Sequence, residues 1–199
     1  ATASQVESCW RELERLGIAD KTIPVTYMNS TAAIKSFTGK HGGTVCTSSN
    51  AEKTLRWAFA KGEKVLFLPD QHLGRNTALL SLGFSESDCV LWNPWKPQGG
   101  LTDDEIRSAK IILWRGHCSV HGRFSIDSVN EVRDRIPGVQ VLVHPECRNE
   151  VVSAADFVGS TEKIITTITQ APAGSKWAIG TELNLVKRLA DSNPDKEIV

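Results

Sequence analysis

Short runs of apolar residues alternate along the chain with longer stretches in which apolar residues recur with the period of an α-helix. Residues 4–17 (SQVESCWRELERLG) show the helical pattern, and residues 64–70 (KVLFLPD) show the apolar run of a buried strand. Alternation of the two patterns over a whole chain is typical of α/β proteins with parallel strands. The sequence therefore predicts an α/β fold with short parallel sheets between layers of helices.

The two halves of the chain repeat one order of elements, strand–helix–strand–helix–strand. A stretch rich in Gly, Pro and Ser, at about 81–109, separates them. We expect two similar three-layer αβα domains, 1–109 and 110–199, with 81–109 as an insertion or connection. The repeated segments are IPVTYMN, STAAIKSFTG, TVCTSS, NAEKTLRWAFAKG and KVLFLPD in the first half, and VQVLVHPE, RNEVVSAA, DFVGS, TEKIITTITQA and KWAIGT in the second.

Polar side chains follow the predicted strands in both halves. In open α/β sheets the strand carboxyl ends and the helix N-termini share one edge, where ligands bind. Hydroxyl-rich helix starts such as CTSSNAEK and VGSTEK fit either anion binding or simple N-capping, and their equivalent places in the repeat favour anion binding. The residues that we expect to project from these edges are Tyr27, Asn29, Ser48, Asp70, His144, Glu146, Ser160, Thr161 and Thr181.

The composition argues against two classes of binding partner, nucleic acids and membranes. Lys plus Arg and Asp plus Glu both number 23, so the formal net charge is zero, and no basic tract marks a nucleic-acid surface. No apolar run approaches the roughly 18 residues of a membrane span. Five widely spread cysteines fit a reducing cytosol better than a disulfide framework. We expect a cytoplasmic protein that binds neither nucleic acid nor membranes.

Reactive side chains gather after two strands of the second half. Cys118 and His121 follow the apolar run IILWRG, and His144, Glu146 and Cys147 follow VLV. The pairs C-x2-H and H-x2-C superficially resemble a zinc site, although structural zinc pairs usually come from compact knuckles. A hydrolase that uses Cys118, His144 and Glu146 is also conceivable, and it requires these three side chains within hydrogen-bonding reach.

Six segments, in order, carry a resemblance to a known family. They are VTYMNSTAAIK, CTSSNA, VLFLPDQHLGRNTA, GHCSVHGRF, VLVHPEC and VGST. Together they resemble quinolinate synthase, the iron–sulfur enzyme family that makes the pyridine ring of NAD, over nearly the whole chain except mainly 81–109. The resemblance implies a parent with three similar α/β domains about a pseudo-threefold axis, of which this chain would be the second and third. The start ATASQVESCW, without methionine, and the end NPDKEIV also lead us to expect a fragment.

The resemblance implies roles for individual residues. Cys118 matches one ligand of a central [4Fe–4S] cluster, the other two cysteine ligands are expected outside this chain, and His121 lies near the cluster. Tyr27, His144 and Glu146 are the implied catalytic residues. Four cysteines match no ligand: Cys9, Cys46, Cys89 and Cys147. The implied substrate-binding residues are Tyr27, Asn29, Ser48, His144, Glu146 and Thr161.

The implied reaction is the condensation of iminosuccinate (iminoaspartate) with dihydroxyacetone phosphate to quinolinate, with loss of phosphate and water. An L-aspartate oxidase or dehydrogenase is the implied supplier of iminosuccinate. One thiolate cannot hold a [4Fe–4S] cluster, so we expect the chain by itself to be inactive. The alternative is a zinc-binding or sugar-phosphate-binding α/β module without catalysis.

Overall fold

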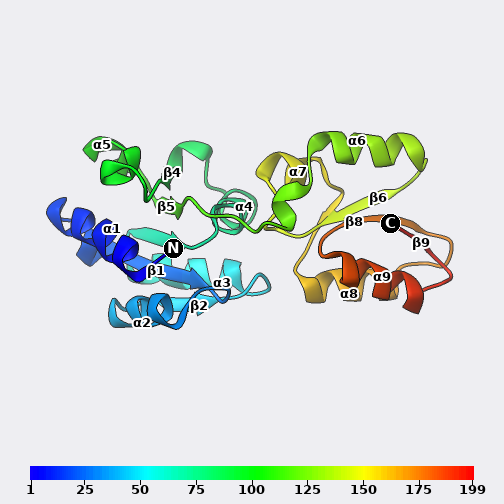
Figure 1. Ribbon diagram of the computed structural model, residues 1–199, viewed down its shortest axis with the longest axis horizontal. Helices are drawn as coiled ribbons and strands as arrows, with labels where there is room; N and C mark the ends of the chain where they lie inside the picture. The colour runs from blue at the N-terminus through cyan, green and yellow to red at the C-terminus, as the bar shows by residue number, and fades with distance from the viewer. The chain divides into compact units, whose positions relative to one another are not determined.

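The computed structural model describes residues 1–199, which form two compact units, Ala1–His117 and Cys118–Val199 (Figure 1). Each unit contains one parallel β-sheet with α-helices packed on both faces. The predicted α/β class, with two three-layer αβα units, is therefore confirmed.

The first unit is built on a five-stranded sheet with the strand order β2-β1-β3-β5-β4. All neighbouring strands in it run parallel. Its elements are α1 (Ala3–Arg15), η1 (Ala19–Lys21), β1 (Thr22–Tyr27), α2 (Ala32–Lys40), β2 (Thr44–Cys46), α3 (Ala51–Lys61), β3 (Lys64–Leu68), α4 (Gln71–Ser81), η2 (Glu86–Asp88), β4 (Cys89–Trp92), η3 (Pro97–Gly100), α5 (Asp103–Ser108) and β5 (Ile111–Trp114).

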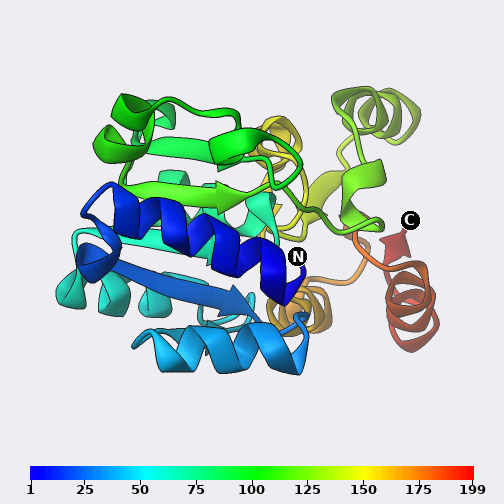
Figure 2. The same ribbon diagram turned by 60° about the vertical axis from the view of Figure 1, so that its left-hand side comes forward.

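The central strand β3 divides the core of the first unit into two layers. Leu66 and Leu68 point to the face covered by α1, α2 and α5, and Val65 and Phe67 point to the face covered by α3 and α4. Figure 2 shows α1 and α2 in front of the sheet. Successive strand residues face opposite ways, so an apolar run without polar interruption is what a strand buried on both faces requires. Each such side chain contributes about 1.5–3 kcal/mol by leaving water.

The second unit is built on a four-stranded parallel sheet with the order β7-β6-β8-β9. Its first three strands repeat the arrangement β2-β1-β3 of the first unit, with equivalent helices between them. The internal repeat predicted from sequence is therefore present in the fold. The elements are η4 (His121–Arg123), α6 (Ile126–Arg135), β6 (Gln140–Val143), α7 (Asn149–Ala154), β7 (Phe157–Val158), α8 (Thr161–Gln170), β8 (Lys176–Gly180), α9 (Leu183–Ser192) and β9 (Glu197–Ile198).

Strand β6 has the same two-faced burial as β3. Val141 and Val143 join the apolar cluster with α6 and α7, whereas Leu142 joins the cluster with α8 and α9. In Figure 1, α6 and the pair α8 and α9 lie on opposite sides of this sheet. The strand ends at Val143, so the polar residues that follow it stand at the carboxyl edge of the sheet.

The division between the units differs from the expected 109/110 boundary. The first unit extends to His117 because β5 (Ile111–Trp114) pairs with both β3 and β4 of the first sheet. The segment 81–109 is also more than a connection, since it contributes strand β4 and helix α5 to the first unit. Its glycines and prolines obscure this in the sequence, because they interrupt the periodic pattern between two short elements.

Several helix starts are capped by polar side chains. Thr102 and Glu105 form a capping box at α5, and Asp70 accepts the backbone N–H groups of His72 and Leu73 at α4. Ser160 accepts the N–H of Lys163 at α8 and therefore caps this helix. None of the helices has the length and apolar character that crossing a membrane would require.

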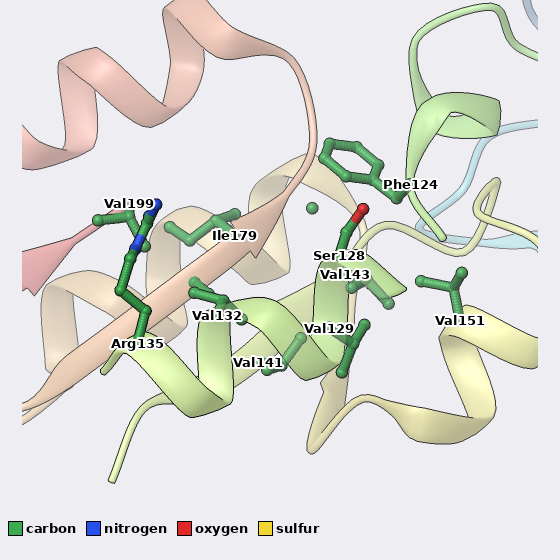
Figure 3. A pocket seen from close by; sticks show the side chains of 12 residues that line it. Phe124, Ser128, Val129, Val132, Arg135, Val141, Val143, Val151, Ile179 and Val199 are labelled. Carbon is green, nitrogen blue, oxygen red and sulfur yellow. The ribbon is translucent and has the colours of Figure 1, made fainter. Parts of the chain in front are cut away.

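A cavity of about 210 Å³ lies in the second unit between α6 and the sheet (Figure 3). Its walls are mainly aliphatic side chains such as Val132, Val141 and Ile179, with Arg135 near Val199 and with Ser128 beside Phe124. A lining with so few polar groups offers little chemistry for catalysis. The chemistry of the second unit lies instead at the carboxyl edge of the sheet.

Candidate metal and substrate site

Two neighbouring strands of the second unit bring their following residues together. In the parallel register of β6 and β8, Val143 pairs with Gly180, so His144 and Thr181 follow side by side. The backbone N–H of His144 donates to the carbonyl of Gly180 at 3.1 Å. A tight turn, in which the Cys147 N–H donates to the His144 carbonyl at 3.0 Å, then places Glu146 at the same edge.

His121 reaches this edge from η4, 19 residues before the start of β6 in sequence. Its ring stacks on that of His144, with centroids 4.2 Å apart and an interplanar angle of 11°. Its Nε2 lies 3.2 Å from the hydroxyl oxygen of Thr181. His121, His144 and Thr181 are all buried. The two imidazoles thus form one packed pair at the end of the sheet.

The carboxylate of Glu146 lies against both imidazoles. Its Oε2 is 3.3 Å from Nδ1 of His121 and 3.4 Å from Nδ1 of His144. The backbone N–H of Glu146 donates to Nδ1 of His144 at 3.3 Å, so this nitrogen is an acceptor. Nδ1 of His121 is buried and has no aligned hydrogen-bond partner. The site therefore contains a buried carboxylate beside a nitrogen that no hydrogen bond satisfies.

Burial, with a smaller contribution from the neighbouring His121, lowers the pKa of His144 to about 4, while Glu146 acts in the opposite direction. His144 is therefore neutral near pH 7. Because its Nδ1 accepts the Glu146 N–H, the single ring proton belongs on Nε2. His144 can consequently donate one hydrogen bond without adding charge to the site.

Cys118 joins His121 and Glu146, and one ligand atom from each lies within 4.8 Å of the others. Cys147 is directed elsewhere: it is fully buried in the α6–α7 core cluster, and its Sγ donates to the Gly180 carbonyl at 3.6 Å. The zinc site assembled from C-x2-H and H-x2-C is therefore wrong in its second pair, because neither His144 nor Cys147 belongs to this group. The Cys118–His144–Glu146 hydrolase is not formed either, because the thiol groups with His121 rather than with His144.

The site residues predicted in the first unit also follow adjacent strands. Tyr27 is the last residue of β1 and is buried, while exposed Asn29 and half-buried Ser48 come two residues after β1 and β2. Tyr27 pairs with Cys46 across the two parallel strands, so all three lie at one sheet edge. In the second unit, Thr161 is exposed at the first position of α8, which follows β7, the neighbour of β6 in the sheet.

Comparison with known proteins identifies the family of the chain. The family model described as "NadA: Quinolinate synthetase A protein" matches residues 1–199. The chain belongs to the quinolinate synthase family. Proteins named quinolinate synthase are 70% identical in Streptomyces coelicolor, 62% in Nocardioides sp. and 52% in Bacillus subtilis, with 100% of this chain covered each time. The chain spans about half the length of these relatives (51%, 52% and 53%).

The cysteines of this chain are not equally suited to be ligands of a cluster. Burial raises the pKa of the Cys9 thiol well above its usual range, and it raises the pKa of Cys46 to about 12 and of Cys89 to about 11. A cluster is held by thiolates, which these protonated thiols do not supply. Half-buried Cys118, among polar side chains, is the cysteine whose surroundings suit a ligand, so this chain fits one position of an iron–sulfur cluster.

Thr181 is a site residue to which the sequence alone assigned no role. It was expected at a strand end, but only the fold shows that its hydroxyl meets His121, which is 60 residues away in sequence. The signal was its position after β8, equivalent to that of His144 after the neighbouring β6. In metal sites, a partner of this kind fixes the orientation of a histidine ring.

Proposed function

We propose that the full-length protein is a quinolinate synthase of NAD biosynthesis. It would condense iminosuccinate with dihydroxyacetone phosphate to quinolinate, with loss of phosphate and water. The observation that carries this proposal is the convergence of Cys118, His121, His144 and Glu146 at one sheet edge in a member of this family. In the same proposal, the two units are the second and third domains of a pseudo-threefold parent.

Cys118 is proposed as one of three cysteine ligands of a [4Fe–4S] cluster, with the other two outside this chain and His121 beside the cluster. An iron ion without a protein ligand would supply Lewis-acid chemistry for a substrate hydroxyl or carboxylate. The thiol of Cys118 lies close to the carboxylate of Glu146. This arrangement would place a cluster next to a group able to transfer protons.

Glu146 and His144 have distinct proposed roles. The buried carboxylate of Glu146 is suited to accept and return the protons that dehydration releases. Neutral His144 would donate its Nε2–H to a substrate oxygen and orient it. Tyr27, as the third catalytic residue, carries a phenol that can donate to a substrate oxygen at its own sheet edge.

The remaining proposed substrate contacts suit anionic groups. Asn29, Ser48 and Thr161 offer neutral hydrogen-bond donors at strand ends, and Thr161 also stands at the N-terminus of α8, where free N–H groups attract phosphate or carboxylate. Both proposed substrates are anions. An L-aspartate oxidase or dehydrogenase would supply the iminosuccinate, and the five widely spread cysteines fit a cytoplasmic location.

The test is made on the full-length protein, purified without oxygen. We expect about four irons and four sulfides per chain, together with quinolinate formation. The 199-residue chain by itself should form no quinolinate. Cys118→Ala should lose iron, sulfide and activity, whereas Cys147→Ala should keep all three, because Cys147 lies in the core cluster with its thiol directed to the Gly180 carbonyl.

Glu146→Gln separates proton transfer from cluster binding. It should keep iron and sulfide and lower kcat about 10²–10⁴-fold, the usual contribution of a general acid or base. Undiminished quinolinate formation by Cys118→Ala would contradict the proposal. Binding of dihydroxyacetone phosphate without any quinolinate would favour the sugar-phosphate-binding module instead.

A further inference from the structure

We propose that Cys118, His121 and Glu146 form a three-ligand site for a single Zn²⁺ ion in protein that carries no cluster. The starting observation is that Nδ1 of His121 is buried. Only 7% of the surface of His121 is exposed. This atom has no hydrogen-bond partner, yet it lies 3.3 Å from the Glu146 carboxylate. A cation between the two atoms gives the buried nitrogen the partner that it lacks.

The separation of these two atoms already matches zinc coordination. Zn–N and Zn–O bonds are about 2.0–2.2 Å, so two ligands at a tetrahedral angle stand about 3.3–3.5 Å apart. His121 Nδ1 and Glu146 Oε2 are 3.3 Å apart. One ligand atom of Cys118 lies within 4.8 Å of a ligand atom of each partner, and zinc binding would draw it in to the roughly 3.5 Å of an S–Zn–N edge.

Thr181 completes the arrangement around the histidine. Its hydroxyl lies 3.2 Å from Nε2 of His121, the nitrogen on the far side of the ring from Nδ1. When Nε2–H donates to this hydroxyl, the lone pair of Nδ1 is fixed toward Glu146. Such a partner on the second nitrogen is the usual companion of a metal-bound histidine, and its loss typically weakens metal affinity about 10–100-fold.

The ligand set indicates which metal ion binds and how this ion affects cluster assembly. One thiolate, one imidazole and one carboxylate form a mixed set that suits borderline-soft Zn²⁺ and leaves a fourth position for water. The Zn²⁺ ion and an iron–sulfur cluster would use the same thiolate, Cys118. Zinc bound here therefore excludes the cluster, and the site makes cluster assembly sensitive to free zinc.

The test is a Co²⁺ titration of the metal-stripped 199-residue chain without oxygen, followed by addition of Zn²⁺. We expect one Co²⁺ per chain, a thiolate-to-cobalt charge-transfer band with the visible bands of tetrahedral Co²⁺, and displacement by one Zn²⁺. Neither signal depends on quinolinate formation, so the proposed function and the zinc site can fail separately. Circular dichroism of each variant verifies folding.

Four variants decide whether these residues are the ligands. Cys118→Ala should lose the charge-transfer band, and the near-isosteric Glu146→Gln should bind Co²⁺ at least tenfold more weakly. Thr181→Val should weaken binding about 10–100-fold while keeping the band. Cys147→Ala is the matched control and should bind as the unchanged chain does. A folded chain without the band, or a band lost in Cys147→Ala and kept in Cys118→Ala, would overturn the proposal.

Discussion

All five cysteines carry the same thiol group, but the fold places them in three kinds of surroundings. Cys9, Cys46 and Cys147 are fully buried in apolar clusters, and Cys89 is partly buried against the α3–α4 cluster. Cys118 lies half-buried beside an imidazole and a carboxylate. Desolvation disfavours the thiolate in the apolar clusters, so the reactivity of each thiol depends on its position in the fold.

Alkylation should therefore discriminate among the thiols. We expect iodoacetamide at pH 8 to modify Cys118 first in the folded chain, as read by peptide mass spectrometry. Cys46, with a pKa raised to about 12, and Cys89, raised to about 11, stay protonated at pH 8 and gain reactivity only as the pH rises toward those values. In denaturant all five should react. Equal rates for Cys46 and Cys118 in the folded chain would contradict this assignment.

Among the elements, β3 has the greatest effect on the stability of the first unit. It lies in the middle of the five-stranded sheet, and all five of its residues are buried. Strand β2, by contrast, lies at the sheet edge, and its Val45 is 39% exposed. The same type of substitution should therefore have very different costs in the two strands.

Leu66→Ala in β3 should lower the free energy of unfolding by about 2–5 kcal/mol, since it removes a fully buried side chain and leaves a cavity between the sheet and α1. Urea unfolding followed by circular dichroism measures the change. Val45→Ala is the control, with an expected effect within about 0.5 kcal/mol. Similar losses for the two variants would mean that β3 is not the centre of this core.

On the scale of the whole molecule, the boundary between the two units follows the β-sheets and not the change in composition along the chain. The segment 81–109 has the composition of a linker, yet it carries β4, which pairs with β5. Strand β5 in turn lies between β3 and β4, with all four of its residues buried. The first sheet is complete only when residues 111–114 are included.

Truncation tests this division. The piece 1–117 should fold and unfold cooperatively in urea, because it contains the complete five-stranded sheet. The piece 1–109 lacks β5, so β4 loses its partner and the core loses four buried side chains. We expect it to show no cooperative transition by circular dichroism. Equal stability of the two pieces would place the boundary back at 109/110.

Much of the fold could be predicted from the sequence because its signals are local. The apolar runs of β3 and β6 and the helical period between the strands depend only on neighbouring residues. The repeat, in turn, correctly indicated that His144 and Glu146 stand at a strand end. The linker-like segment was misjudged because its two elements are too short, at four and six residues, to show a period.

The sequence by itself determined the α/β class, the internal repeat, the family and the polar strand ends. Only the tertiary structure decided that Glu146 rather than Cys147 joins Cys118 and His121, and that Thr181 holds the histidine ring. Adjacent residues in a turn point in different directions, and contacts over 60 residues depend on how strands pair. Periodicity records which face of an element is buried, whereas the composition of a site depends on which elements become neighbours.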